Sequence, residues 1–403
     1  MALISPTELT YKAPGTHEEN RFEKLHNVIV PSAAMGSELI AQEIANLIRN
    51  KQAKNKKCVL GLATGSSPLS VYAELVRMHK EEGLSFENVI TFNLDEYWPM
   101  RKDNPQSYRH FMHENLFDHI DIKPENIHIP DGEVKSSQVR TYCQEYEAKI
   151  EAFGGLDFQL LGIGRTGHIG FNEPGSNQNS RTRLVNLDHI TREDAAEGFQ
   201  GLEFVPKRAI TMGIATVLSA KRVVLMAWGQ KKSGVIQQAV EGAITSTLPS
   251  SFLQLHKNTT LVLDEEAAAD LTRIKTPWLV QTCEWNDKLK YQAVVWLCRK
   301  TGKSVLKLTE SDYNENALAD LLETQSIYDL NIEIFNRLQH TITGWPGGKP
   351  DADDSHRPER ARPKSKRVII FSPHPDDDVI SMGGTLDRLI SQGHEVHVAY
   401  QTS

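Results

Sequence analysis

The sequence predicts an α/β fold in which helices cover both faces of a mainly parallel sheet. From about residue 35 onward, short apolar segments that are typical of buried strands alternate with longer segments of helical spacing. Glycine-rich or polar motifs directly follow several of the apolar segments. In open α/β sheets such motifs gather at the carboxyl edge of the strands, where ligands bind.

The elements follow in chain order. Residues 35–51 have helical spacing, and the next elements are a strand at 58–62, a helix at 67–80 and a strand at 89–92. With further helices between them, we expect additional strands at 157–163, 222–227 and 259–263. Residues 1–280 would form this first domain.

The remaining chain is expected to fold differently. Apolar residues around Trp285, Trp296 and Leu321 have helical periodicity, so residues 281–342 are predicted to form a helical extension. Glycine and proline interrupt a charged stretch at 343–366, which we interpret as a linker. A new strand begins at Arg367. Residues 367–403 are too few for a core of their own, so we expect an incomplete second α/β domain.

Composition narrows the class of protein. The 403 residues allow about two to three domains. A formal net charge of -7 argues against nucleic acid or an anionic membrane as the main partner. Met1–Asn20 has no apolar core that would indicate a secretory signal, and no run approaches the about 18 apolar residues of a membrane span. The cysteines are far apart, as expected for reduced thiols in a cytoplasmic enzyme: Cys58, Cys143, Cys283 and Cys298.

The first chemical motif is a turn between the strand at 58–62 and the next helix. Its backbone amides and hydroxyls would converge on a phosphate, assisted by the positive end of the helix. The alternative is an ordinary tight turn with a helix cap. A lysine after the strand at 222–227 would add a cation at the same edge, or would simply be solvated. The residues concerned are Thr64, Gly65, Ser66, Ser67 and Lys232.

Two further motifs carry groups that transfer protons. Asp95 follows the strand at 89–92, where burial would raise its pKa toward values useful in a base that takes a proton from carbon. The alternative is a helix N-cap or a solvated acid in a loop. His168 and Glu173 follow the strand at 157–163. An imidazole transfers protons near neutral pH while a carboxylate fixes its orientation. A lone histidine is more often structural, but several such groups at one sheet edge favour an active site.

These motifs resemble those of the glucosamine-6-phosphate deaminase family over residues 25–275. The resemblance implies a modified Rossmann-like sheet, no organic cofactor and frequent assembly into hexamers. It also implies conversion of glucosamine 6-phosphate and water into fructose 6-phosphate and ammonia. The matching blocks are Leu60 to Gly65, Thr91 to Tyr97, Gly167 to Pro174, Ser180 to Arg183 and Gln238 to Gly242.

The resemblance also implies roles for individual residues. Asp95 would remove the proton from C2 and return it at C1, after His168 assists opening of the sugar ring. Glu173 would orient His168. The substrate phosphate would be held by Thr64, Gly65, Ser66, Ser67 and Lys232.

The chain departs from the family pattern at three places. Thr166 stands where the family has an aspartate that partners the histidine. No arginine lies around 195–197, where the family has one that binds phosphate, and Val185 replaces a lysine of the allosteric members. From the first departure we expect a smaller contribution of general acid/base catalysis to the rate. From the second we expect an altered substrate affinity or identity, and from the third no conventional allosteric activation by an acetylated amino-sugar phosphate.

The segment after the linker resembles a second family, the zinc-dependent N-acetylglucosaminyl deacetylases. The resemblance implies that His374 and Asp377 bind Zn²⁺ and that Asp376 activates its water. The family's other histidine ligand would lie beyond Ser403, so we expect zinc only in a complete deacetylase-like domain. Without the resemblance, the motif would be an acidic turn.

The sequence thus predicts a cytoplasmic amino-sugar-phosphate deaminase or isomerase that acts on a small sugar phosphate and assembles into a homo-oligomer. A sensor or scaffold that keeps the pocket but has weakened chemistry is the alternative, and Thr166 motivates it. Hydrolysis of a sugar-phosphate lactone on the same fold is less favoured, because the blocks at 95–97 and 171–174 match the deaminases.

Overall fold

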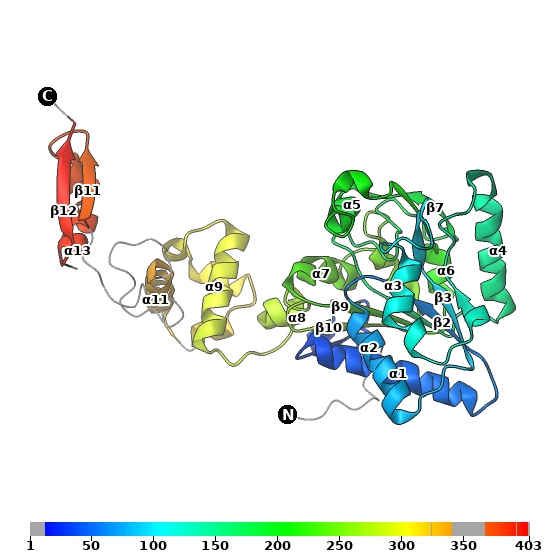
Figure 1. Ribbon diagram of the computed structural model, residues 1–403. Coiled ribbons are helices and arrows are strands. Elements are labelled where there is room, and N and C mark those ends of the chain that lie inside the picture. The colour runs from blue at the N-terminus through cyan, green and yellow to red at the C-terminus, as the bar shows by residue number, and fades with distance from the viewer. Residues whose placement is uncertain (1–12, 324, 341–366, 392, 402–403) are drawn as a thin grey trace. The chain divides into compact units, whose positions relative to one another are not determined.

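The computed structural model of the chain describes residues 13–323, 325–340, 367–391 and 393–401 (Figure 1). The chain divides into two compact units, Met1–Cys283 and Glu284–Ser403. The predicted linker at 343–366 lies outside the described residues. All residues predicted to take part in deamination belong to the first unit.

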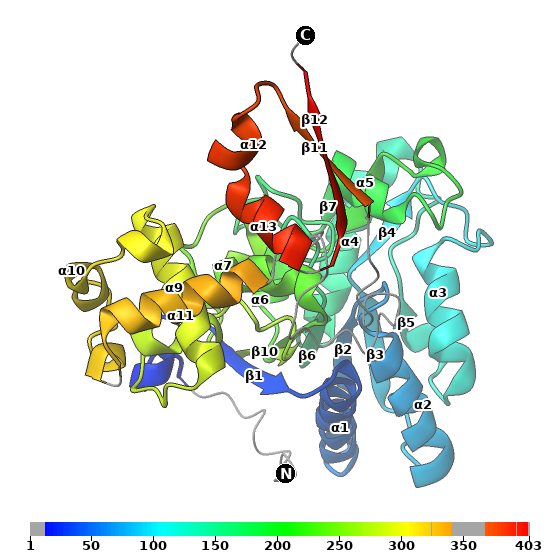
Figure 2. The same ribbon diagram turned by 90° about the vertical axis from the view of Figure 1, so that its left-hand side faces the viewer.

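The first unit contains a seven-stranded sheet whose neighbouring strands all pair in parallel. The predicted α/β class is therefore confirmed. In Figure 2 the labels β1, β10, β6, β2, β3 and β5 follow one another across the sheet. In spatial order the strands are β1 (His26–Val30), β10 (Thr259–Asp264), β9 (Val223–Ala227), β6 (Phe158–Leu161), β2 (Cys58–Leu62), β3 (Val89–Asn93) and β5 (Ile127–His128).

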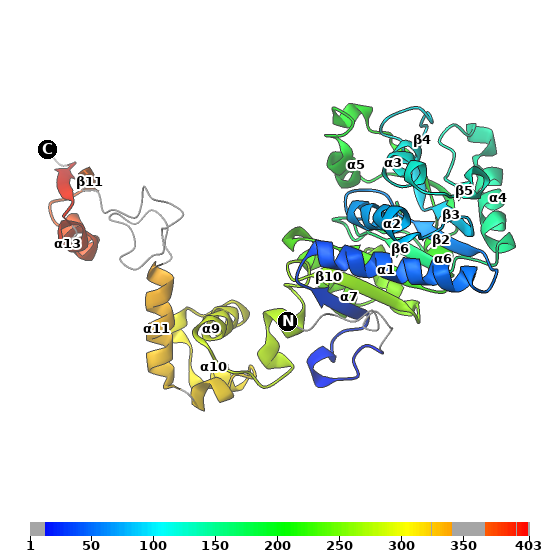
Figure 3. The ribbon, with the colours of Figure 1, turned by 60° about the horizontal axis from the view of Figure 1, so that its bottom comes forward.

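Helices cover both faces of this sheet, as predicted. Helices α1 (Ala33–Gln52), α2 (Leu69–Glu82) and α3 (Tyr108–Asn115) bury apolar side chains on one face, where α1 and α2 lie side by side (Figure 3). The hydroxyl of Ser32 caps α1 by accepting the Met35 amide. The other face is covered by α4 (Val139–Ala152), α6 (Ile214–Leu218) and α7 (Ser233–Glu241).

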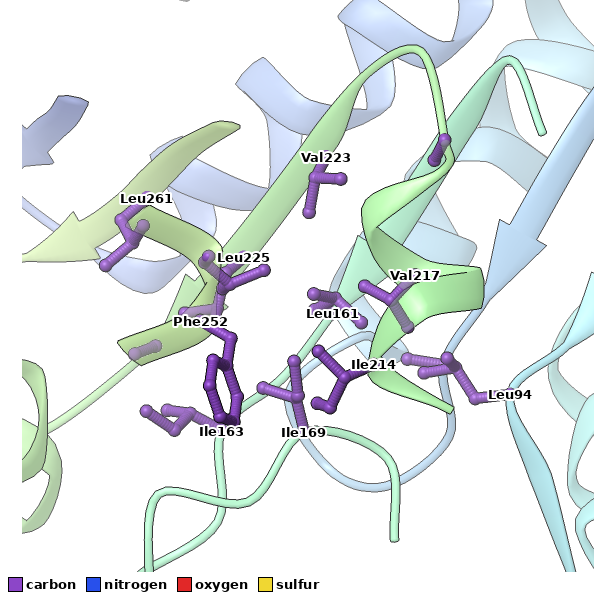
Figure 4. Close-up of a cluster of buried hydrophobic side chains, with 14 of the residues drawn as sticks. Leu94, Leu161, Ile163, Ile169, Ile214, Val217, Val223, Leu225, Phe252 and Leu261 are labelled. Atoms are coloured by element: carbon purple, nitrogen blue, oxygen red, sulfur yellow. The ribbon is translucent and has the colours of Figure 1, made fainter. Parts of the chain in front are cut away.

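The core on the α6 face lies directly below the carboxyl edge of the sheet. Figure 4 shows Leu161 and Leu225 of the strands facing Ile214 of α6 and Phe252. Ile169, which comes from the His168 motif, packs into the same cluster and is fully buried. A close-packed interior of this kind resists displacement, so it fixes the loop that carries His168.

A second, antiparallel sheet lies beyond the ends of the parallel strands, and the sequence did not predict it. It consists of β4 (Asp95–Trp98), β8 (Arg208–Thr211) and β7 (Arg183–Asn186). Each strand has four residues and includes charged or polar ones, so no apolar run marks it. Pairing of β4 with β8 places Asp95 opposite Thr211.

Close contact between the segment that precedes β7 and the start of α6 requires a glycine at position 213. A Cβ atom there would overlap the backbone carbonyl of Ser180, and backbone yields less readily than a side-chain end. We expect Gly213→Ala to lower the free energy of unfolding by about 1–3 kcal/mol, measured by urea denaturation. Gly162→Ala is the matched control, because a Cβ at Gly162 meets no atom within 4 Å. Equal losses in both variants would contradict the steric explanation.

The second unit contains the predicted helical segment and the start of the predicted α/β fragment. The helices are α9 (Asp287–Thr301), α10 (Glu310–Asn314) and α11 (Ile327–His340). Strands β11 (Arg367–Ser372) and β12 (Glu395–Tyr400) pair in parallel, and α12 (Asp377–Ile380) and α13 (Gly383–Ser391) connect them. Within the described ranges, no helix has the length and apolar character needed to cross a membrane.

Candidate active site

A cavity lies where the order of the parallel sheet reverses direction. The chain continues from β2 to β3 and β5 on one side, and from the neighbouring β6 to β9 and β10 on the other. Ligands of open α/β sheets bind at such a point, outside the carboxyl ends of the strands. The cavity has a volume of about 330 Å³. Its lining includes Thr64, Gly65, Ser66, Ser67, Asp95, Tyr97, Tyr108, His168, Gly170, Phe171, Thr191, Asp194 and Lys232.

The predicted phosphate turn forms one wall of this cavity. Gly65 has a φ of +97°, which a residue with a side chain rarely adopts. The hydroxyl of Tyr72 donates to the carbonyl of Ala63, and Trp228 Nε1 donates to the carbonyl of Ser67 at 3.2 Å. The turn is therefore held at both ends, and no side chain caps helix α2, which follows it.

Lys232 reaches the same cavity from the end of β9. Its Nζ donates to the carbonyl of Ile163 at 2.7 Å, which holds the ammonium group beside the end of β6. Burial lowers the pKa of Lys232, and the nearby carboxylate of Asp194 opposes that shift. The structure thus brings together the turn and the lysine that the sequence assigned to a phosphate.

Asp95 lies on the cavity wall at the start of β4 and is only 4% exposed. Burial and the neighbouring charge of Glu96 raise the pKa of Asp95 to about 8, although an interaction with the Phe171 backbone amide partly opposes them. Gly170 adopts a φ of +56° beside it, and a Cβ at Gly170 would lie 3.0 Å from Asp95 Oδ2. The carboxyl group therefore has the basicity and the enclosed setting of a base acting on carbon.

Glu96 has a structural role that the sequence did not indicate. Its buried carboxylate accepts the backbone amides of Tyr97 at 2.9 Å and of Tyr108 and Arg109 at 3.0 Å each. Burial raises the pKa of Glu96 to about 7, although these hydrogen bonds oppose the shift. Because Tyr108 also lines the cavity, Glu96 fixes the start of α3 against the site.

His168 lies in a tight loop after β6. A Cβ at Gly164 would overlap the imidazole ring, so the ring packs over a position that only glycine allows. The Nδ1 atom lies 2.9 Å from Thr166 Oγ1, 3.3 Å from Glu173 Oε2 and 3.4 Å from Thr191 Oγ1. Three polar groups thus surround one ring nitrogen, Nδ1.

Glu173 connects the histidine to helix α5 (His189–Ala195). Its Oε1 accepts the Asp188 amide at 3.2 Å, at the start of α5. Burial would raise the pKa of Glu173, but the nearby His168, the Thr191 hydroxyl and the Asp188 amide outweigh it and the pKa is lowered. Oε2 lies within ion-pair distance of His168 Nδ1 but makes no well-aligned hydrogen bond among the described residues. We therefore regard Thr166 as the better-aligned hydrogen-bond partner of the ring.

Several lining residues were not predicted. Tyr97, Tyr108 and Phe171 form an aromatic wall, in which the rings of Tyr108 and Phe171 stack with centroids 5.8 Å apart. Tyr97 directly follows Asp95 and Glu96, so its position after the motif was an available signal. Thr191 and Asp194 reach the cavity from α5, and nothing in the local sequence marks them.

The departures from the family pattern fall at different distances from the cavity. Thr166 contacts His168 directly, as described above. Ala195 lines the cavity without supplying a charge. Val185 lies in β7, outside the cavity lining, and is half-buried.

In the acidic motif of the second unit, His374 and Asp376 are exposed, whereas Asp377 is half-buried. His374 Nδ1 lies 3.0 Å from Asp377 Oδ2, and Asp376 precedes α12. No cluster of three or more His, Cys, Asp or Glu side chains suited to a metal occurs in the part of the chain that the structure describes. Zinc sites use four ligands, of which at least three come from the protein, so these residues alone do not fit the ion.

Comparisons with known proteins show which families the two parts of the chain resemble. The family model described as glucosamine-6-phosphate isomerases/6-phosphogluconolactonase matches residues 31–262, and the model of GlcNAc-PI de-N-acetylase matches residues 369–403. A putative glucosamine-6-phosphate deaminase-like protein of Bacteroides thetaiotaomicron is 56% identical over 384 residues. That alignment covers 95% of this chain but only 58% of the relative's length.

Shorter relatives match the first unit. Glucosamine-6-phosphate deaminase of Shewanella woodyi is 50% identical over 233 residues, which cover 58% of this chain and 88% of that protein. The structure of a monomeric glucosamine-6-phosphate deaminase is 41% identical with a TM-score of 0.59, and the match covers 61% of this chain and all of that one. A 6-phosphogluconolactonase of Trypanosoma brucei, 19% identical with a TM-score of 0.51, shares the fold over 62% of this chain and 99% of its own. The chain belongs to the family of glucosamine-6-phosphate isomerases and 6-phosphogluconolactonases.

Proposed function

We propose that the cavity converts glucosamine 6-phosphate and water into fructose 6-phosphate and ammonia, and that the protein is therefore a hydrolase. One observation carries this proposal: a buried carboxyl group of raised pKa, Asp95, lines the same cavity as His168. The hydroxyl-rich turn and the ammonium group of Lys232 line it as well, which suits a phosphorylated ligand. The identity with named deaminases supports the choice of an amino sugar.

The proposed reaction uses two proton-transfer groups in sequence. His168 moves a proton between the ring oxygen and the C1 hydroxyl, which opens the sugar and exposes an aldehyde at C1. The aldehyde acidifies C2, so Asp95 removes the C2 proton and returns it to C1, while the C1 oxygen gains a proton that the C2 ammonium group loses. The product of this transfer is an imine at C2. Addition of water there releases ammonia and leaves the ketone of fructose 6-phosphate.

A sensor or scaffold with the same pocket is the second candidate. The contact between Thr166 and His168 favours it, because a hydroxyl either donates to or accepts from Nδ1 and so does not fix the tautomer. A carboxylate only accepts, which would keep the proton on Nδ1 and leave Nε2 free to act as a base. A ring whose tautomer is not fixed binds ligand as well as before but transfers protons less efficiently.

Ammonia release from glucosamine 6-phosphate separates these candidates. We expect purified protein to release ammonia and to form fructose 6-phosphate in equal amounts. Thermal stabilisation by the sugar phosphate without ammonia release would instead favour the sensor. Hydrolysis of 6-phosphogluconolactone without deamination would assign the cavity to the other activity of the family.

The pH dependence of turnover tests the role of Asp95. A base must be ionised to accept a proton, and the pKa of Asp95 is raised to about 8. We expect kcat/KM to fall as pH decreases through about 8, whereas an ordinary solvated aspartate would give no change until about pH 4. The substrate phosphate ionises near pH 6 and would produce a separate, lower step. A flat profile between pH 6 and 9 would contradict the assignment.

We further propose that deamination needs no organic cofactor and that the protein is a cytoplasmic homo-oligomer, as the family resemblance implies. A carboxylate and an imidazole are sufficient for the proton transfers described above. Ammonia release by purified protein to which no cofactor has been added tests the first point, and a mass measured by light scattering tests the assembly. Zinc is proposed only for a complete deacetylase-like domain.

A further inference from the structure

An acidic side chain lies at the end of the cavity that is proposed to take the phosphate. Asp194, on helix α5, lines the cavity together with the turn at 64–67 and Lys232. Its carboxylate is engaged by one arginine: Arg165 Nη2 lies 2.8 Å from Asp194 Oδ1, and Arg165 Nε donates to Oδ2 at 3.1 Å. Such a two-point contact matches the planar fork of the guanidinium group.

Arg165 is also electrostatically coupled to the proposed phosphate site. It lies close enough to Lys232 for its charge to lower the pKa of that lysine, while Asp194 acts in the opposite direction. The Arg165 side chain is 50% exposed, and its other ion-pair contact is a longer one of 3.9 Å to Glu193. Asp194 and Lys232 line one end of the cavity, and Arg165, which is not among the lining residues, contacts Asp194 directly. We call these three residues the charged triad.

The charges of this triad do not suit a phosphate in their present pairing. A phosphate monoester carries nearly two negative charges at pH 7. If it entered between the turn and Lys232, it would meet one cation and the carboxylate of Asp194, whose charge Arg165 already offsets. The guanidinium of Arg165 binds phosphate in the same bidentate geometry as a carboxylate, so the two anions compete for it.

We propose that Arg165 is a phosphate-binding residue that Asp194 holds in the free protein, so that a phosphate monoester binds by displacing Asp194 from it. The motif comparison assigned neither residue to the site, and Ala195 and its neighbours supply no arginine there. Arg165 thus provides the second cation of the subsite. This inference rests on the proposed function only in taking the ligand to be a sugar phosphate.

Binding measurements test the displacement. Inorganic phosphate, glucosamine 6-phosphate and unphosphorylated glucosamine are titrated calorimetrically into the full chain and its variants. We expect Arg165→Ala to weaken the affinity for inorganic phosphate and for glucosamine 6-phosphate by about 10-fold or more, because a charge-assisted hydrogen bond is lost. Arg165→Lys should retain part of the affinity, since it keeps the charge but not the fork. Asp194→Asn should increase the affinity for both phosphate-containing ligands, because it removes the carboxylate that competes for Arg165. Affinity for glucosamine should not change with either residue.

Either of two kinds of result would overturn the inference, one from the Asp194 variant and one from the Arg165 variant or the wild type. The first is an Asp194→Asn variant that binds phosphate more weakly than the wild type, as expected if the pair only anchors α5. The second is an Arg165→Ala variant with wild-type phosphate affinity, or a wild type that binds no phosphate. Arg101→Ala is the matched control, because Arg101 makes a similar contact of 2.6 Å to Asp103 at the surface. It should leave every affinity unchanged.

The same measurements separate this inference from the proposed function. Phosphate binding that depends on Arg165 without ammonia release would contradict the deaminase proposal and leave the phosphate subsite intact. Ammonia release with an Arg165→Ala variant whose KM equals that of the wild type would contradict only the role of Arg165. If both hold, the loss in Arg165→Ala should appear mainly in KM, because the residue touches the phosphate and not the reacting carbons.

Discussion

Replacement of Asp95 by asparagine is expected to reduce kcat for ammonia release by about 10³- to 10⁴-fold, the upper part of the range for a lost general base. Asparagine has nearly the same shape and fills the same buried position, but it does not accept a proton from C2. Phosphate affinity should remain close to that of the wild type, because the turn at 64–67 and Lys232 are unchanged. Asp103→Asn, at an exposed ion pair, is the matched control and should keep full activity.

The same substitution should increase stability at alkaline pH. The pKa of Asp95 is raised in the folded protein from 3.8 to about 8, so the folded state holds a proton that the unfolded chain has lost. The raised pKa of Asp95 therefore lowers the free energy of unfolding. This destabilisation is absent below about pH 4, grows as pH rises, and is complete above about pH 8. We therefore expect Asp95→Asn to melt at a higher temperature than the wild type at about pH 9, with no difference near pH 4.

The adjacent acid provides the opposite expectation. Glu96→Gln weakens hydrogen bonds to the Tyr97 amide in β4 and to the Tyr108 and Arg109 amides at the start of α3, so it should lower the melting temperature. If Asp95→Asn were destabilising at about pH 9, Asp95 would have a structural role like that of Glu96. If Asp95→Asn retained more than about a tenth of the wild-type kcat, another group would be the base.

The parts of the site that the sequence predicted all follow parallel strands. Asp95, His168 and Lys232 come after β3, β6 and β9, and the carboxyl ends of parallel strands meet at one edge regardless of their distance along the chain. Strand pairing therefore placed these residues together once the α/β class was recognised. The turn at 64–67 follows β2 for the same reason.

The parts that the sequence did not predict depend on contacts that have no local signal. Strands β4, β7 and β8 are short and polar, and they exist because they pair with one another beyond the main sheet. That pairing and the capping of α3 by Glu96 bring Tyr97 and Tyr108 to the cavity. Asp194 lies on the short helix α5, which hydrogen bonds with Glu173 and Arg165 hold in place, and neither residue is close to this helix in the sequence. Tertiary contacts of this kind override local propensity.

Thr166→Asp is expected to raise kcat for ammonia release by about 10²-fold, within the range of a general acid/base contribution. Thr166 Oγ1 lies 2.9 Å from His168 Nδ1, so a carboxylate oxygen at a similar distance would accept a hydrogen bond from Nδ1–H and fix the tautomer with Nε2 free. The introduced charge would also stabilise the imidazolium that forms during ring opening. KM should change little, because position 166 is outside the proposed phosphate subsite.

A neutral substitution distinguishes charge from shape. Thr166→Asn places an amide of nearly the same size beside His168 and should give no gain, because its oxygen carries no full charge. If both variants were equally active, packing and not the carboxylate would limit the wild type. If Thr166→Asp gave no gain, the existing contact of 3.3 Å between Glu173 and His168 would already supply the charge. Glu173→Gln should then reduce kcat of the wild type by about 10²-fold. If the aspartate introduced at position 166 can replace Glu173, the double variant Thr166→Asp, Glu173→Gln would stay active.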